Sequence, residues 1–133
     1  MTGWLSAQLG DYERGLRGSR RALILHREAR NRHGEADAWT TIGYAYSRLG
    51  SDRAAIISFE RALTLRRELG DRHNEASILG HMGDAHHAAG NLEAARNAWQ
   101  QAMAVLDDLH HPDAAQMRAR IEHLAGTHPA FSK

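Results

Sequence analysis

The chain has 133 residues, enough for one compact domain with a modest core. Its 17 basic and 16 acidic side chains give a formal charge of +1, which argues against a dedicated nucleic-acid surface because such a surface carries a basic excess. The absence of cysteine excludes a disulfide framework and a cysteine zinc site. No apolar stretch approaches the roughly 20 residues of a membrane span, and no signal-peptide core is present, so we expect a soluble cytoplasmic protein that contacts no membrane.

The opening segment, MTGWLSAQLG, matches the second half of a helix that recurs later in the chain. Gly3 stands 40 residues before Gly43, in the same position of the pattern. We therefore expect the chain to open inside a truncated N-terminal half-helix and to be a fragment of a longer protein. Trp4 and Leu5 would then lack cover, and exposed apolar groups favour association. We expect a homodimer formed through residues 1–25.

A glycine followed by a helix-capping residue recurs at an interval of 40 residues: Gly10-Asp11, Gly50-Ser51 and Gly90-Asn91. The short polar side chain accepts a hydrogen bond from the free amides of a first helical turn. The glycine before it suits the left-handed residue that ends the preceding helix. These pairs predict three turns, each ending one helix and starting the next.

Apolar residues at helical spacing predict helices on both sides of each turn. Helices after the glycine turns are expected over about 11–30, 52–69 and 92–109. The intervening helices are expected over about 33–48, 72–88 and 112–125, with Pro112 at a first helical position, where proline is tolerated. Gly43 and Gly83 should let a neighbouring helix approach closely, so Gly43→Leu should overpack the crossing and cost about 1–3 kcal/mol.

Seven positions of the pattern occur twice: Trp39, Ile42, Gly43, Tyr46, Ala55, Phe59 and Ala62, and then Leu79, Met82, Gly83, His86, Ala95, Trp99 and Ala102. This pattern resembles the tetratricopeptide repeat. Two features depart from it: Arg67 and Asp107 stand where the usual proline ends the second helix, and the interval exceeds the common ~34 residues. Both fit a variant with a longer second helix, similar to arrays in kinesin light chains and in large actinobacterial transcriptional regulators.

The resemblance implies an all-α fold, a right-handed α-solenoid of antiparallel helix pairs. It would contain about six helices plus the truncated N-terminal half-helix. The array would occupy residues 1–126, as repeats at about 1–32, 33–71 and 72–110 and a capping helix at 112–125. Residues 127–133, which include Pro129, should form a frayed tail.

Catalytic and metal-binding patterns are weak in this chain. Of its ten histidines, no two have the i, i+4 spacing that places two ligands on one helical face. There is no GxSxG sequence and no phosphate-binding loop. Short arginine runs are interrupted by acidic residues, as on ordinary exposed helices. We expect no enzyme activity, no cofactor, no metal and no direct nucleic-acid binding.

The resemblance also implies a binding surface, because the first helices of successive repeats in that family line a concave groove for a protein or peptide partner. By position, the groove residues would be Asp37, Thr40, Thr41, Tyr44, Ser47, Arg48, Ser77, Gly80, His81, Asp84 and His87. The alternative is that these polar side chains are simply solvated. The function implied is that of a protein–protein interaction module.

Two finer interpretations remain open. The segment HHPDAAQMRARIEHL at 110–124 resembles the end of C-terminal repeat segments in actinobacterial transcriptional regulators, which implies a regulatory role within a larger protein. The alternative is a sensor domain that binds a signalling peptide or small ligand in a pocket beside Tyr44 and Asp84.

Overall fold

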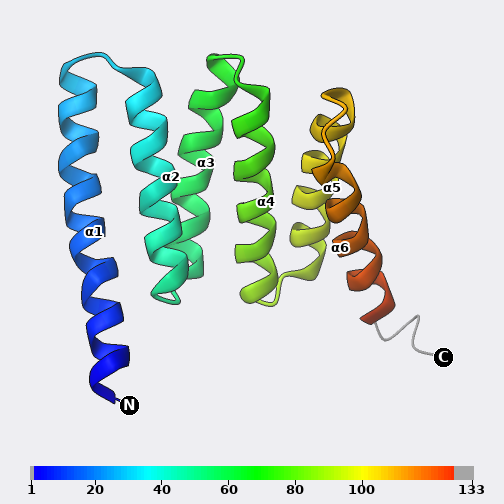
Figure 1. Cartoon of the computed structure of the whole chain (residues 1–133), viewed down its shortest axis with the longest axis horizontal. Helices are drawn as coiled ribbons and strands as arrows, with labels where there is room; N and C mark the ends of the chain where they lie inside the picture. The colour runs from blue at the N-terminus through cyan, green and yellow to red at the C-terminus, as the bar shows by residue number, and fades with distance from the viewer. Residues whose placement is uncertain (1, 128–133) are drawn as a thin grey trace. The chain divides into compact units, whose positions relative to one another are not determined.

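The computed structural model describes the backbone of residues 2–127 and the side chains of residues 8–124, and this part of the chain contains six α-helices and no strand (Figure 1). The helices are α1 (Thr2–Glu28), α2 (Arg32–Arg48), α3 (Asp52–Glu68), α4 (Arg72–Ala88), α5 (Leu92–Asp108) and α6 (Asp113–Thr127). The predicted all-α fold, in which consecutive helices pack as pairs, is confirmed. Of the predicted tail, residues 128–133 lie outside the described residues.

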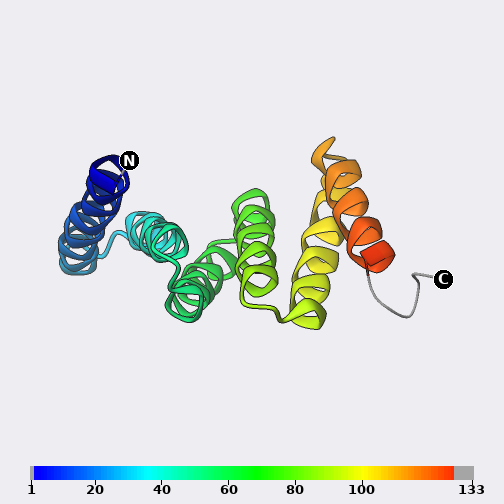
Figure 2. The same ribbon diagram turned by 90° about the horizontal axis from the view of Figure 1, so that it is seen from below.

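The chain forms two compact units, Met1–Gly70 with α1 to α3 and Asp71–Lys133 with α4 to α6. In the first unit α2 packs against both α1 and α3, and in the second α5 packs against both α4 and α6 (Figure 2). The middle helix of each unit is therefore covered on two sides. None of the described helices combines the length and the apolar character that crossing a membrane would require.

Each of α1 to α5 is followed by a residue with positive φ, and these residues recur every 20 positions: Arg30 (55°), Gly50 (80°), Gly70 (68°), Gly90 (83°) and His110 (53°). The turn at Gly50 shows the shared hydrogen bonds. The Gly50 amide donates to the Ser47 carbonyl at 3.1 Å, and the Ser51 amide donates to the Tyr46 carbonyl at 2.9 Å. These bonds satisfy carbonyls at the helix end. The predicted turns at Gly50 and Gly90 are confirmed.

The residue after each of the first four turns is an N-cap: Asn31, Ser51, Asp71 and Asn91. Three of these side chains accept from an amide of the first turn, Asn31 from Gly34 at 3.0 Å, Asp71 from Asn74 at 3.3 Å and Asn91 from Ala94 at 3.4 Å. The Ser51 side chain makes no such bond. The sequence thus predicted the position of the Ser51 cap correctly, but not its hydrogen bonding.

The predicted turn at Gly10-Asp11, and with it the separate half-helix, is wrong, because α1 runs without a break from Thr2 to Glu28. Asp11 lies inside this helix and pairs with Arg14. Glycine permits a left-handed conformation without imposing it. The side chains of Trp4 and Leu5 lie outside the described residues.

Two helical glycines let an aromatic ring rest directly on a backbone. A Cβ atom on Gly43 would lie 2.7 Å from the Cδ1 atom of Phe59, and one on Gly83 would lie 2.9 Å from the Cε2 atom of Trp99. Phe59 is only 1% exposed, so its ring is enclosed by neighbouring groups. The predicted close approach at both glycines is confirmed, and the ring of the following helix makes the contact in each repeat.

Arg30→Gly is expected to stabilise the protein by about 0.5–1 kcal/mol. Arg30 has a φ of 55°, a conformation that costs an L-residue with a Cβ atom more than it costs glycine. Part of the gain is offset by the greater freedom of glycine in the unfolded chain. Urea unfolding measures the effect. Arg21→Gly, an exposed change inside α1, is the control and should lower stability by about 1 kcal/mol. Destabilisation by both changes would contradict the prediction.

Candidate functional site

The predicted groove residues of the first unit all lie on α2, and their exposure differs. Asp37, Thr41, Tyr44 and Arg48 are exposed, whereas Thr40 and Ser47 are half-buried. The Thr40 hydroxyl donates to the Ala36 carbonyl at 2.9 Å, and the Thr41 hydroxyl donates to the Asp37 carbonyl at 3.0 Å. Both threonine donors are therefore used within α2.

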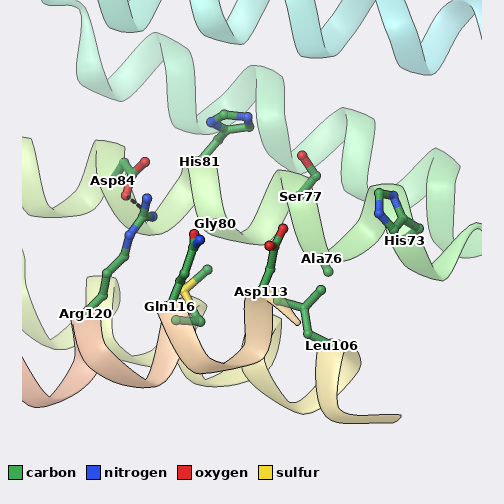
Figure 3. A pocket seen from close by; sticks show the side chains of 11 residues that line it. His73, Ala76, Ser77, Gly80, His81, Asp84, Leu106, Asp113, Gln116 and Arg120 are labelled. Atoms are coloured by element: carbon green, nitrogen blue, oxygen red, sulfur yellow. Dashed lines mark hydrogen bonds and ion pairs between the residues drawn. The ribbon is translucent and has the colours of Figure 1, made fainter. Parts of the chain in front are cut away.

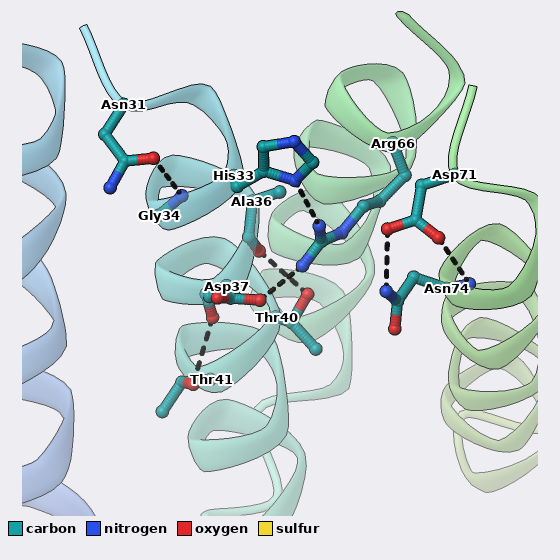
Figure 4. A network of polar contacts seen from close by, with 10 residues as sticks. All are labelled: Asn31, His33, Gly34, Ala36, Asp37, Thr40, Thr41, Arg66, Asp71 and Asn74. Atoms are coloured by element: carbon teal, nitrogen blue, oxygen red, sulfur yellow. Dashed lines mark hydrogen bonds and ion pairs between the residues drawn. The ribbon is translucent and has the colours of Figure 1, made fainter. Parts of the chain in front are cut away.

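Asp37 belongs to a polar network that joins α2 to α3 (Figure 4). Arg66 reaches across from α3 with its side chain 7% exposed and forms an ion pair with Asp37. Its Nη1 atom also lies 3.4 Å from Nδ1 of His33. A buried guanidinium needs such partners to offset its loss of hydration. Asp37 thus helps to hold α2 on α3, in addition to any role at the surface.

Tyr44 and Arg48 form a second pair on α2, one helical turn apart. The Tyr44 hydroxyl accepts from Nε of Arg48 at 3.0 Å and from Nη2 at 2.7 Å. The guanidinium carbon lies 5.0 Å from the centre of the ring. The hydrogen bond to Tyr44 raises the pKa of the Arg48 guanidinium above its ordinary value. The pair presents an aromatic ring and a fixed positive charge to solvent.

In the second unit, α4 and α6 enclose a hollow of about 200 Å³, hereafter the α4–α6 hollow (Figure 3). Four predicted groove residues line it: Ser77, Gly80, His81 and Asp84. The other lining residues are His73 and Ala76 of α4, Leu106 of α5, and Asp113, Gln116, Met117 and Arg120 of α6. The structure therefore places most of the predicted α4 residues around one concave space.

The floor of the α4–α6 hollow is apolar and its ends are polar. Met117 and Leu106 are buried beneath it, and the Met117 methyl lies 3.3 Å from where a Cβ atom of Gly80 would stand. At one end Nη1 of Arg120 donates to Oδ1 of Asp84 at 3.1 Å, as Figure 3 shows. At the other end the ring of His73 is a lining group. A bare helix backbone at Gly80 leaves the space between these ends open.

His87 is the predicted groove residue of α4 that does not line the hollow. Its ring lies 5.7 Å from that of Trp99, on α5. His73 and the lining residues from α6 were not among the predicted groove residues. The repeat interval gave a usable signal, since α6 follows α4 by one interval and should line the same groove. Two ion pairs of the second unit join residues that lie 36 positions apart in the sequence. Asp84 pairs with Arg120 at 3.1 Å, and Arg72 pairs with Asp108 at 2.9 Å.

Metal-binding side chains do not converge within the described part of the chain. No group of three or more His, Asp or Glu residues there could hold a metal ion. His73 and His111 lie close, with ring centres 5.1 Å apart. Nδ1 of His111 accepts from the Asp113 amide at 3.1 Å, which places this histidine at the start of α6 as a structural partner.

Comparison with known families agrees with the repeat seen in the structure. Two family models, both described as tetratricopeptide repeat, match residues 36–69 and 54–108. The chain matches no curated protein. The matched residues span α2 to α5, the two helix pairs that carry the repeated Gly–aromatic contact. Repeats of this kind are generally protein–protein interaction modules. Over residues 36–108, more than half of its length, this chain consists of tetratricopeptide repeats.

Proposed function

We propose that the protein is a protein–protein interaction module in which the α4–α6 hollow receives a side chain of a partner peptide. The observation that carries the proposal is the hollow itself, formed at Gly80 between two helices. Its volume of about 200 Å³ lies below the roughly 300–1,000 Å³ of sites for small-molecule ligands. The size favours a single peptide side chain over the alternative of a sensor site for a free small ligand.

The chemistry of the hollow also suits a peptide. Ser77 and Gln116 face it from opposite helices, and each offers both a donor and an acceptor. A peptide main chain carries an N–H and a C=O at each residue and needs both kinds of partner. The buried side chains of Leu106 and Met117 would contact an apolar side chain from below. On the first unit, Tyr44 and Arg48 are proposed as a separate contact surface.

Gly80→Leu tests the proposal, because it fills the hollow from within. A Cβ atom on Gly80 meets only the flexible end of Met117, so the helix tolerates the change, while the longer side chain occupies the space meant for the ligand. Peptides selected from a displayed random library on the native protein should lose at least about tenfold in affinity, equivalent to ~1.4 kcal/mol. Fluorescence anisotropy with labelled peptides measures the loss.

Two controls belong to this experiment. Gly80→Ala adds one methyl group and fills little of the α4–α6 hollow, so most of the peptide binding should remain. Leu92 is exposed on α5, and Leu92→Asp should leave peptide binding unchanged. Circular dichroism confirms that each variant is folded. If the selected peptides bind Gly80→Leu as tightly as they bind the native protein, the α4–α6 hollow is not the peptide site.

The regulatory role is a further proposal. The resemblance of residues 110–124 to the end of repeat segments in actinobacterial transcriptional regulators supports it. The chain would then act as the partner-sensing segment of a larger cytoplasmic protein and would make no direct contact with nucleic acid. The full open reading frame that contains this chain tests the regulatory role, because a larger regulator would encode further domains in the same frame.

Self-association through residues 1–25 also remains a proposal. Leu9, within this stretch of α1, is an exposed large apolar residue, which supports an interface there. Sedimentation velocity across a range of protein concentrations distinguishes a dimer from a monomer, and a single monomeric species at high concentration would exclude this interface.

A further inference from the structure

The first unit contains a groove that the proposed function does not use, at the place where α1, α2 and α3 meet. It has a volume of about 290 Å³ and is lined by Arg20 and Leu23 of α1, Trp39, Ile42 and Tyr46 of α2, and Ala54, Ile57 and Ser58 of α3. We call it the arginine groove, because Arg20 lines it and Arg27 and Arg61 lie beside the ring of Trp39, another lining residue. It lies wholly within Met1–Gly70 and so shares no residue with the α4–α6 hollow.

The floor of the arginine groove is apolar and open to a ligand. Leu23 and Ile42 are 6% and 2% exposed and form its base. Ile57 is 49% exposed, so its side chain is accessible to a ligand in the groove. The Ser58 hydroxyl donates to the Ala54 carbonyl at 2.9 Å, so its hydrogen is already used. A bound side chain would therefore meet mainly apolar atoms.

Three guanidinium groups stand at the aromatic residues of this groove. The Arg20 side chain hydrogen-bonds to the Tyr46 hydroxyl, and its guanidinium carbon lies 5.7 Å from the Tyr46 ring centre. The guanidinium carbons of Arg27 and Arg61 lie 5.6 and 5.5 Å from the Trp39 ring centre. Aromatic faces attract cations but do not neutralise their charge. The positive charge around Trp39 and Tyr46 is thus held in place.

No carboxylate of the described residues forms an ion pair with Arg20, Arg27 or Arg61. Between residues 8 and 70, the ion pairs that the structure shows involve other arginines: Arg14, Arg32 and Arg66. Glu60 lines a neighbouring hollow together with Arg61 and Ile57, yet no ion pair joins it to Arg61. Some other exposed arginines do pair with carboxylates, as Arg118 does with Asp107 at 3.4 Å. The guanidiniums beside Trp39 and Tyr46 thus have no ion-pair partner among the described carboxylates.

We infer that the arginine groove binds an acidic peptide segment, with an apolar side chain inserted against Leu23, Ile42 and Ile57 and flanking carboxylates paired with the arginines. Arginine pairs with carboxylates through two parallel hydrogen bonds, so the three guanidiniums favour Asp or Glu on both sides of the anchor. The apolar floor separates this occupant from a nucleic acid, whose phosphates would use the charges and leave the floor exposed to water.

Three labelled synthetic peptides of equal length test the inference with the full chain. One has a Leu and Phe core flanked by Asp and Glu, one has the same core flanked by Lys, and one keeps Asp and Glu but replaces the core with Ser. Fluorescence anisotropy at low and high salt measures their binding. Only the acidic peptide with the apolar core should bind, and its affinity should fall as salt is raised.

Two variants connect this binding to the groove. Ile57→Asp places a carboxylate at the anchor position, and the double change Arg27→Gln with Arg61→Gln removes charge beside Trp39. Each should weaken binding of the acidic apolar peptide at least tenfold. Leu92→Asp, a similar change of an exposed leucine in the second unit, should leave it unchanged. Unaltered circular dichroism shows that the variants are folded.

Several results would overturn the inference: no binding of the acidic apolar peptide, equal binding of all three peptides, or unweakened binding to Ile57→Asp. Displacement of the peptide by a single-stranded oligonucleotide that itself binds more tightly would also overturn it, since the groove would then be a nucleic-acid site. Because Gly80→Leu changes the other unit, peptides of this set should still bind that variant. Failure at one site is therefore distinguishable from failure at the other.

Discussion

Gly83→Ala is expected to lower the free energy of unfolding by about 1–3 kcal/mol, although alanine is ordinarily the better helix former. The new methyl group would stand against the Trp99 indole, 2.9 Å from its Cε2 atom. Trp99 is only 6% exposed, and its Nε1 atom donates to the Gly80 carbonyl at 3.3 Å, so the ring cannot turn aside without losing that bond. The overpacking cost exceeds the gain of ~1 kcal/mol in helix propensity. Urea unfolding followed by circular dichroism measures the change.

Gly80→Ala is the matched control for this prediction, because it lies on the same helix and gains the same helix propensity. Its Cβ atom would meet only the mobile methyl of Met117, at 3.3 Å. We therefore expect Gly80→Ala to be neutral or to stabilise the protein by up to about 1 kcal/mol. Equal effects of the two substitutions would mean that the Trp99 ring yields, and that glycine at position 83 is not required for packing.

Phe59→Ala should have the largest effect of any single substitution in the first unit, with a loss of about 3–5 kcal/mol. The ring is 1% exposed and rests on the bare backbone of Gly43, so its removal opens a cavity between α2 and α3. Urea unfolding measures the loss. Ile57→Ala on the same helix is the control, and because Ile57 is 49% exposed the change should stay within about 0.5 kcal/mol.

A double variant tests whether the Gly43–Phe59 contact itself is responsible. Gly43→Leu alone should cost about 1–3 kcal/mol, because the leucine would overlap the Phe59 ring. In the Phe59→Ala background the same leucine enters the vacated space, so it should cost less or even stabilise. Additive losses would show that the two residues are not coupled through packing, against the usual behaviour of residues in contact.

The sequence predicted most of the fold because the same signals occur at a fixed interval. The predicted boundaries of α2 to α6 agree with the structure within two residues, and at Gly50 and Gly90 the signal was a turn glycine followed by a capping residue. The first predicted boundary, at Gly10, was wrong although the signal was the same, because glycine permits a left-handed turn without imposing one. The left-handed turns at Arg30 and His110 gave no such signal, because neither residue type favours positive φ as glycine does.

The candidate site was predictable only in part. Ser77, Gly80, His81 and Asp84 could be placed on one face of α4 from the repeat pattern. The opposite wall of the hollow was missed, although α6 follows α4 by one repeat interval, because α6 carries little of the pattern that marks the other helices. The arginine groove was missed for a different reason: Arg27 and Arg61 lie on separate helices, and only the three-dimensional structure brings both to Trp39.

The regular return of a left-handed residue every 20 positions has a consequence for how such a protein lengthens. Residues 31–70, for example, run from the cap after the Arg30 turn to the Gly70 turn. These 40 residues contain two whole helices, α2 and α3, together with the residues that start and end each of them. Duplication of such a span in the gene would therefore insert a helical hairpin that carries its own capping and turn residues. Adding or removing one such span would therefore leave the remaining helix ends and turns unchanged.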